Sequence, residues 1–387
     1  MQPKHPPSGD RLLTAPFVLC SAANLLQGLA FNLYLHLPGF LKQLGAGEAQ
    51  IGFVFGLAAA AAIAVRPAIG RIMDMQGRRI VIWAGGLVHT AVCALYLYIT
   101  TIGPNVYMIR AAHGLAEAAL FGAFFTYAAD LIPPSRRTEG IALFGVSGML
   151  PISLGGLLGD AILVRADYAV LFRTSIVLAA GSFALSLLLR DRTLTVDELP
   201  NRGFFATLVQ GDLLPVWFLG TIFTTALAAY FTFLKTYVME TGYGSVGSFF
   251  TAYAVAAIAL RLLLSWLPER VGVKRVLFPA LGLLALGILL LAAATVGSEV
   301  IAAGVLCGLG HGFIFPILSA LVVTRARPAE RGAALSIFTA LSDAGVLIGG
   351  PVLGTVIHVA GYAAMFTTAA FLVVAGALVF AAWDSRH

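Results

Sequence analysis

The chain has 387 residues, of which 59% are hydrophobic and only 11% are charged, with a formal net charge of +6. Soluble domains carry about 25% charged residues, so this composition excludes a water-soluble protein and is typical of an integral membrane protein. Cys20, Cys93 and Cys307 lie far apart in apolar runs, which predicts core residues and neither a disulfide nor a metal site.

Apolar runs near the length of about 20 residues that a spanning helix needs follow one another along the chain. They cover residues 14–38, 48–69, 80–101, 105–130, 138–160, 168–189, 213–239, 246–267, 276–297, 300–324, 332–357 and 361–383. The pattern predicts an all-α membrane protein with twelve transmembrane helices, since a barrel would show short alternating segments. The longest polar interruption divides six spans from six. We therefore expect an N-terminal six-helix bundle over 1–189, a cytoplasmic linker over 190–212 and a C-terminal six-helix bundle over 213–387.

Most of the 24 lysines and arginines fall on the side of the membrane that also holds both termini. Basic residues concentrate in cytoplasmic loops, so we expect both termini inside and a multi-pass protein of the cell (inner) membrane. The first apolar run lacks a clear cleavage site and is interpreted as a mature span.

Three short stretches recur in the same order in the two halves. "RPAIGRIMDMQGRRI" from Arg66 is similar to "RLLLSWLPERVGVKRV" from Arg261, "RAAHG" is similar to "GLGHG", and "RRTEGIAL" is similar to "PAERGAAL". Repeats of this kind are common in secondary transporters. The sequence predicts two pseudo-symmetric bundles in which residues about 195 apart superpose.

The same stretches resemble the signature motifs of the major facilitator superfamily (MFS), over the whole chain. The loop after the second span is similar to G-x-L-a-D-r-x-G-r-k, and "RAAHG" is similar to R-x-x-q-G, with His113 where glutamine is usual. "GMLPISLGG" in the fifth span is similar to the antiporter motif G-P-x-x-G-G, although Gly148 and Pro151 are separated. The resemblance implies a secondary transporter similar to drug and metabolite efflux proteins, which is not an enzyme and carries no cofactor.

The loop after the second span and its counterpart in the second half are expected to gate the transport path. Asp74 adds nothing to orientation, and the resemblance places it at the cytoplasmic junction of the halves, where we expect it to form a latch with Arg78. Gly70 and Gly77 are expected to permit close helix approach and a tight turn. The expected gating residues are Gly70, Asp74, Gly77, Arg78, Arg79, Glu269 and Arg270.

The resemblance also implies that helices 1, 4, 7 and 10 line a central cavity, while helices 3, 6, 9 and 12 face lipid. Polar and aromatic residues of this chain gather in the first set. Halving the spans puts Gln27, Glu117, His311 and Asp343 near the membrane midplane, where secondary transporters bind cargo. The expected substrate-binding residues are Asn24, Gln27, Phe31, Tyr34, Glu117, Tyr230, Lys235 and His311.

Ionisable groups inside membrane spans are costly and point to function. The expected proton-coupling residues are Arg110, His113, Glu117 and Asp343. Glu117 lies two turns after Arg110 on the same helix face, with His113 between them. Burial favours a neutral carboxyl group and a nearby arginine favours the charged one, so Glu117 is expected to exchange a proton and to face the cavity. A purely structural buried network is the alternative, as are packing roles for Asp343 and His311 and snorkelling by Lys235.

No G-K-[ST] sequence is present, so a P-loop for ATP is excluded and transport must use a gradient. The sequence favours proton-coupled efflux, by antiport and alternating access, of a small amphipathic organic solute. Proton-linked uptake of a small organic anion or metal chelate is the alternative, and sodium coupling and facilitated diffusion remain open. A non-transporting membrane receptor is a more remote interpretation. The expected partners are the solute, protons and the lipid bilayer, without nucleic acid, and the chain is expected to be a monomer.

Overall fold

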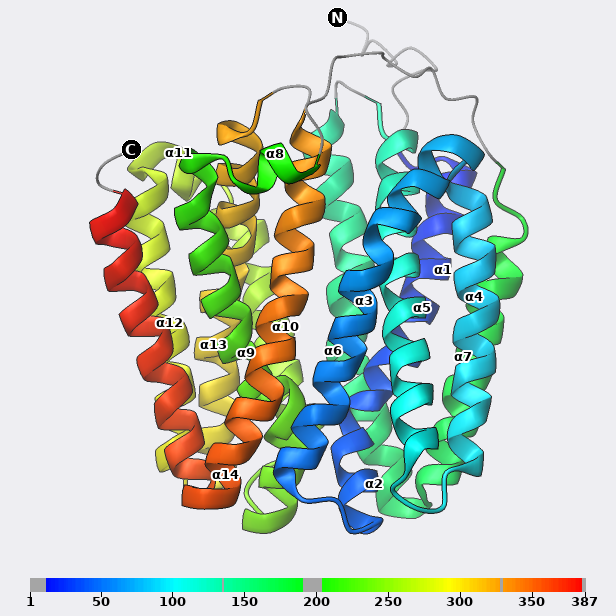
Figure 1. Cartoon of the computed structure of the whole chain (residues 1–387), viewed down its shortest axis with the longest axis vertical. Helices are drawn as coiled ribbons and strands as arrows, with labels where there is room; N and C mark the ends of the chain where they lie inside the picture. Colours follow the sequence, from blue (N-terminus) through cyan, green and yellow to red (C-terminus); the bar gives the residue numbers. More distant parts are fainter. Residues whose placement is uncertain (1–11, 134–135, 191–203, 328–329, 385–387) are drawn as a thin grey trace, which may run out of the picture.

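The computed structural model describes residues 12–133, 136–190, 204–327 and 330–384, and within these ranges the regular structure is helical (Figure 1). The N-terminal half contains α1 (Ala15–Asn32), η1 (Leu33–His36), α2 (Leu37–Gln43), α3 (Glu48–Gln76), α4 (Arg78–Leu95), η2 (Tyr96–Tyr98), α5 (Pro104–Leu131), α6 (Arg137–Arg165) and α7 (Tyr168–Ser186). The C-terminal half contains α8 (Phe204–Leu208), η4 (Gly211–Leu213), α9 (Leu214–Thr241), α10 (Val246–Leu264), α11 (Leu267–Val271), α12 (Val273–Ala293), α13 (Gly297–Arg325) and α14 (Arg331–Asp384).

Ten helical segments among the described residues are long and apolar enough to cross a bilayer. One of them, α14, consists of two helices in series, because Gly361 adopts a φ of 81° that interrupts the helical backbone. Another helix, α5, has the length of a span but carries Arg110, His113 and Glu117, which lower its hydropathy. Counting both, the structure contains the twelve spans expected from the sequence, and the chain is a multi-pass membrane protein.

The long helices form two groups that stand side by side (Figure 1). Helices α1–α7, the N-terminal group, pack on one another, and helices α9–α14, the C-terminal group, do the same. The groups meet mainly where α3 packs on the first part of α14 and where α6 packs on α10. The described helices α1 and α14 begin and end, respectively, at the upper edge of Figure 1. We call this edge the terminal end and the opposite edge the distal end.

Glycines bring the two groups into close contact in their distal halves. A Cβ atom added to Gly52 of α3 would lie 2.0 Å from the carbonyl oxygen of Gly350 in α14, and one added to Gly354 would lie 2.5 Å from the carbonyl oxygen of Glu48. On the other side, a Cβ atom at Gly247 of α10 would lie 2.8 Å from the backbone of Leu157 in α6. Such distances leave room for glycine alone, so the distal end is closed.

Toward the terminal end the same helices leave more space. Nothing lies within 4 Å of a Cβ atom added to Gly70 of α3, or to Gly145 and Gly148 of α6. The close helix approach that the sequence predicts at Gly70 is therefore absent in this conformation, because the groups approach each other in their distal halves instead. The structure represents a state that is closed at the distal end.

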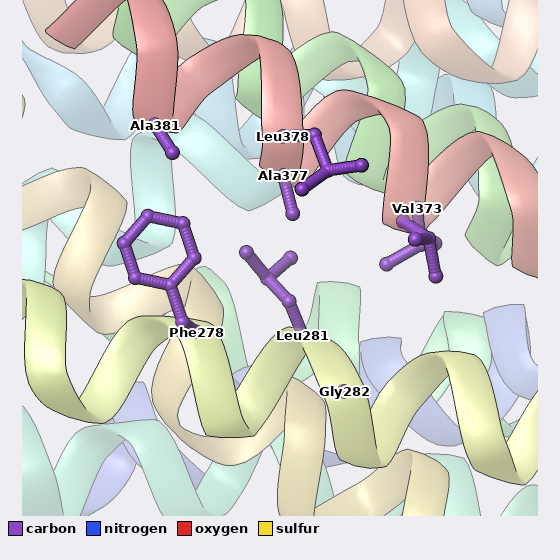
Figure 2. Close-up of a pocket in the computed structure, with 8 residues that line it drawn as sticks. Phe278, Leu281, Gly282, Val373, Ala377, Leu378 and Ala381 are labelled. Atoms are coloured by element: carbon purple, nitrogen blue, oxygen red, sulfur yellow. The ribbon is translucent and has the colours of Figure 1, made fainter.

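An apolar groove lies between α12 and the second part of α14 (Figure 2). Its lining includes Phe278, Leu281 and Leu378, and the side chain of Leu378 is 67% exposed on the lateral surface. These helices are the ninth and twelfth spans, which the family resemblance places against lipid. The groove is accordingly interpreted as a lipid-facing surface.

Candidate functional site

Glu117 is held by Gln27 at the centre of the N-terminal group. The Gln27 amide of α1 donates a hydrogen bond to a carboxylate oxygen of Glu117 on α5, and the Gln27 side chain is buried. The charges of Arg110, Asp343 and Arg66 all act on Glu117. Gln27 therefore links Glu117 to α1, and the orientation of Glu117 toward the cavity stays a prediction.

An ion pair joins the two groups close to this carboxylate. The Nε and Nη2 atoms of Arg66 on α3 lie 2.7 and 2.6 Å from the same carboxylate oxygen of Asp343 on α14. Only 15% and 24% of these two side chains are exposed. Arg66 lies about 15 Å, or roughly ten residues, from the terminal end of α3. The pair is therefore deep in the protein, where a charge requires a partner.

Arg110 and His113 lie deeper in the N-terminal group than Glu117. The guanidinium carbon of Arg110 sits 4.3 Å from the centre of the Phe55 ring, and an Arg110 nitrogen lies 3.5 Å from Nδ1 of His113. The Tyr96 hydroxyl lies 3.2 Å from the same Nδ1 atom. A cation over an aromatic face is stabilised by the ring quadrupole, so Arg110 is balanced here by rings. Direct contacts join Arg110 to His113 and Gln27 to Glu117, and the coupling of all three ionisable groups stays a prediction.

The other expected binding residues of the first span divide between two environments. Asn24 donates a hydrogen bond of 2.9 Å to the Ser147 hydroxyl of α6. Phe31 packs edge-on against the His113 ring at 5.4 Å. Tyr34 is buried among aromatic rings of its own group, including Phe172. Asn24 and Gln27 therefore join α1 to neighbouring helices at the level of Glu117, whereas Tyr34 is part of the core.

In the C-terminal group, His311 lies near the middle of α13 (Gly297–Arg325). The Tyr253 hydroxyl forms a short hydrogen bond with Nδ1 of His311, and the Phe223 ring packs edge-on against the imidazole at 5.2 Å. Tyr230 is fully buried against the rings of α10. Lys235 is half-buried at the distal end, next to Gly39. Of the expected substrate-binding residues in this group, His311 is the one nearest the middle of its helix.

The loop between α3 and α4 lies at the terminal end. Gly77 has a φ of 91°, a conformation that favours glycine and allows the tight turn expected there. Arg78 donates to the Met73 carbonyl at 2.7 Å and to the Asp130 carboxylate of α5 at 3.2 Å. The side chain of Asp74 lies outside the described residues, so its latch with Arg78 stays a prediction.

Two further cations of the expected gate lie over tryptophan rings. Arg79 sits 3.9 Å from the centre of the Trp83 ring, and Arg270 sits 5.0 Å from that of Trp266. Glu269, next to Arg270 on α11, is exposed. Gating by these residues remains a prediction, since this state is closed at the other end.

His36 and Asp160 form a polar contact that sequence reasoning missed. An Asp160 carboxylate oxygen of α6 lies 2.9 Å from Nε2 of His36, and the other accepts a hydrogen bond of 2.6 Å from the Gly247 amide of α10. Asp160 therefore links the two groups at the distal end. The signal that could have found it is an ionisable residue near the end of an otherwise apolar run.

Comparison with known proteins agrees with this architecture. The model of the Major Facilitator Superfamily matches residues 17–249 and 216–387. The chain belongs to the Major Facilitator Superfamily. It is a membrane transporter and not an enzyme, which confirms the family, the fold class and the general role predicted from the sequence.

Several individual members of the family are similar to this chain over most of its length. The staphylopine export protein of Staphylococcus aureus (strain Mu50 / ATCC 700699) is 25% identical over 366 residues, which cover 89% of each chain. An uncharacterised MFS-type transporter of Pseudomonas aeruginosa (strain LESB58) is 26% identical over 373 residues, covering 90% of this chain and 88% of the relative.

Among solved structures, a mutant of the nucleoside transporter NupG superposes with a TM-score of 0.79 at 14% identity. The superposition covers 95% of this chain and 99% of that one. The human organic anion transporter MFSD10 superposes with a TM-score of 0.71 at 18% identity, covering 97% and 100% of the two chains. At these identities the structural similarity establishes the shared fold.

Proposed function

We propose that this transporter exports a small amphipathic organic solute from the cell in exchange for protons. The observation that carries the proposal is the hydrogen bond from Gln27 to Glu117. It places the Glu117 carboxyl group in the middle of a span, within electrostatic range of the Arg66–Asp343 pair. A carboxyl group inside a membrane span costs free energy, so its presence there indicates a function. One that can gain or lose a proton near the contact between the groups is suited to couple proton entry to their movement.

The proposed cycle begins in the conformation described here, which is closed at the distal end. The positive-inside rule places the terminal end in the cytoplasm, so cargo would enter from that side and meet Asn24, Gln27, Phe31 and Glu117. Opening the distal end requires the contacts of α3 with α14 and of α6 with α10 to separate. Protonation of Glu117 from outside would neutralise the carboxylate, weaken its hold on the cargo and favour the return of the groups.

The proton gradient supplies enough free energy for this step. One proton entering across a membrane potential of 100 mV yields about 2.3 kcal/mol, and each unit of pH difference adds about 1.4 kcal/mol. These quantities are comparable with the free energy of a single partly buried ion pair. A change of charge at Glu117 can therefore bias the equilibrium between two conformations of the groups.

Export is supported by the similarity to the staphylopine export protein, since the match covers 89% of this chain and 89% of that protein. The glycine and proline pattern around Pro151 in α6 supports the same direction. The mixture of an acidic group, amides and aromatic rings along α1 and α5 suits a cargo with both polar and apolar parts. Proton-linked uptake of an organic anion would instead require Arg110 and Lys235 to clamp the cargo, and Arg110 is buried and packs over the Phe55 ring.

The experiment has two stages. A thermal-shift panel of amphipathic cations, zwitterions and anions on the purified chain identifies a ligand, and its movement is then measured in inside-out and right-side-out membrane vesicles. Export by antiport predicts accumulation in inside-out vesicles when their lumen is acidified, and loss of accumulation when an ionophore collapses the pH gradient. Accumulation in right-side-out vesicles driven by external acid would overturn the direction. Accumulation that ignores the pH gradient would overturn the proton coupling.

A further inference from the structure

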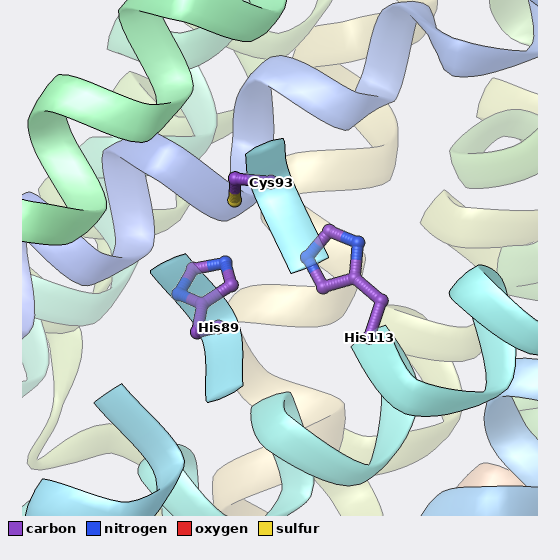
Figure 3. A group of neighbouring side chains, drawn as sticks. All are labelled: His89, Cys93 and His113. Atoms are coloured by element: carbon purple, nitrogen blue, oxygen red, sulfur yellow. The ribbon is translucent and has the colours of Figure 1, made fainter. Parts of the chain in front are cut away.

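Two histidines and a cysteine meet inside the N-terminal group, away from Glu117. His89 and Cys93 lie one turn apart on the same face of α4, and His113 projects toward them from α5 (Figure 3). One nitrogen of each imidazole and the sulfur of Cys93 lie within 4.8 Å of one another. All three side chains are at most 1% exposed. The sequence analysis assigned no role to His89 and interpreted Cys93 as a core residue.

The two imidazole donor atoms of this cluster lack partners of their own. Within the part of the chain that the structure describes, the Nε2 atoms of His89 and His113 are buried and have no hydrogen-bond partner. Figure 3 shows both rings directing a nitrogen toward the space beside the Cys93 sulfur. Leaving a buried polar atom unsatisfied costs about 1–3 kcal/mol. Two such atoms that point at one sulfur therefore indicate a missing ligand and not ordinary packing.

The outer contacts of the cluster are those of an oriented metal ligand set. The remaining ring nitrogen of His113, Nδ1, lies 3.2 Å from the Tyr96 hydroxyl. The Ser175 hydroxyl donates to the Cys93 sulfur at 3.3 Å. Metal-binding histidines commonly use their second nitrogen for a hydrogen bond that fixes the ring. In the metal-binding tautomer, Nδ1–H of His113 donates to the Tyr96 oxygen, and the Ser175 hydroxyl supplies a donor for the Cys93 sulfur.

The distances require only a small adjustment to hold an ion. Nitrogen and thiolate ligands lie about 2.0–2.3 Å from a metal such as zinc, which places ligand atoms roughly 3.5–4 Å from one another around a shared ion. The donor atoms now lie within 4.8 Å of one another, and side-chain rotation is enough to bring them to the spacing of a bound ion. The His–Cys spacing of four residues on one helix makes this easier, because positions i and i+4 are neighbours on the helix surface.

The charge of the surroundings selects the ion. Imidazole and thiolate ligands suit Cu⁺ and Zn²⁺, and an Arg110 nitrogen already lies 3.5 Å from His113. A thiolate with Cu⁺ is neutral overall, whereas a thiolate with Zn²⁺ leaves an additional positive charge in a buried site beside that guanidinium. Uncompensated buried charge is costly. We propose that His89, Cys93 and His113 form a binding site for Cu⁺. Binding forms a bond from copper to the Cys93 sulfur, breaks the S–H bond and releases the proton to solvent, without any change in oxidation state.

The second repeat shows that the fold itself does not require these ligands. At the repeat offset of about 195 residues, His113 corresponds to Gly308 of α13. The stretch of α12 that corresponds to His89 and Cys93 reads "LALGILLL" from Leu284 to Leu291 and contains neither histidine nor cysteine. The donor pair is thus a property of the N-terminal group alone. This site goes beyond the proposed export function, and its test does not use transport.

The test measures copper binding by the purified full-length chain under anaerobic, reducing conditions. Cu⁺ is supplied as its bicinchoninate complex, and the metal retained after desalting is quantified by mass spectrometry. The wild type is expected to retain one copper per chain. Cys93→Ser is expected to weaken binding at least about tenfold, since losing even an outer contact of a metal ligand costs about 10–100-fold. Cys20→Ser and Cys307→Ser are matched controls at buried cysteines elsewhere and should bind like the wild type.

X-ray absorption of the copper-loaded wild type provides a measurement that does not depend on the folding of any variant. One sulfur and two nitrogen neighbours at about 2.0–2.3 Å are expected. Equal copper retention by the Cys93→Ser variant, or a spectrum without a sulfur neighbour, would overturn the site. Stoichiometric retention of Zn²⁺ in competition with Cu⁺ would overturn the assignment of a monovalent ion.

Discussion

The Arg66–Asp343 pair should stabilise the conformation that is closed at the distal end, because it joins α3 to α14 across the two groups. Replacing Asp343 with Asn removes the pair and leaves the arginine without its carboxylate. An exposed pair contributes about 0–1 kcal/mol, and breaking a fully buried one costs about 3–5 kcal/mol. With side chains 15% and 24% exposed, we expect a value of about 1–3 kcal/mol, which shifts the conformational equilibrium about 5–150-fold.

The shift can be measured as a distance between spin labels at the distal end. Thr101 and Ser298 are exposed on different groups and are suitable for cysteine labelling, and the three native cysteines are buried. Electron–electron resonance on the wild type should show mainly the short distance of the closed distal end. Asp343→Asn should increase the population with the long distance.

A double-mutant cycle separates the ion pair from other effects of the substitution. If the pair acts as described, adding Arg66→Gln to Asp343→Asn should cause little further change, because the interaction is already lost. The exchange of charges in Arg66→Asp with Asp343→Arg should restore part of the wild-type population. An Asp343→Asn distance distribution identical to that of the wild type would refute the assigned role of the pair.

Three further substitutions test other parts of the structure. Gly52→Ala should hinder closure of the distal end and reduce transport, since its Cβ would meet a carbonyl at 2.0 Å. Gly282→Ala, on a lipid-facing helix with open space around it, should transport normally; equal activities in a vesicle assay would contradict the close-contact interpretation. Asp74→Asn should slow transport at saturating cargo but leave cargo affinity nearly unchanged, and a normal maximal rate would exclude the latch. Asp384→Ala should lower the thermal unfolding temperature, because it removes the carboxylate that lies 2.5 Å from the Arg325 guanidinium and so breaks a partly buried ion pair. An unchanged temperature would show that the pair does not stabilise the C-terminal group.

The spans could be predicted because the bilayer imposes length and hydropathy on every helix that crosses it. The sequence even separates the last two spans near Gly361, where the structure has a positive φ. Glycine readily adopts the positive φ that interrupts a helical backbone, so it is a signal that a helix ends there. The family follows from the loop motif around Gly77, whose backbone conformation only glycine readily adopts.

The pairing of side chains across helices could not be predicted in the same way. Gln27 and Glu117 were each placed near the midplane, but their hydrogen bond depends on how α1 and α5 are rotated toward each other. Arg66 was noted as the start of a recurring stretch, and nothing in the local sequence indicates that it reaches Asp343. Helix tilt and rotation depend on packing between distant segments, and sequence periodicity does not contain them.

The metal-binding cluster was hidden for a related reason. His89 and Cys93 have ligand spacing on their helix, but the third donor, His113, comes from the next span after a turn of the chain. A search for local ligand motifs therefore returns nothing at Cys93. Only the packing of α4 on α5 brings the three donors together.

Transport by Glu117→Gln in proteoliposomes tests the central claim most directly. The measurement compares accumulation of the identified cargo under an imposed pH gradient with simple exchange of labelled for unlabelled cargo. Glu299→Gln, at a carboxyl group in the first turn of α13 on the distal end, is the control. The account predicts that Glu117→Gln still exchanges cargo but no longer accumulates it, because an amide keeps the shape and cannot carry the proton. Undiminished accumulation driven by the pH gradient in that variant would contradict proton coupling at Glu117.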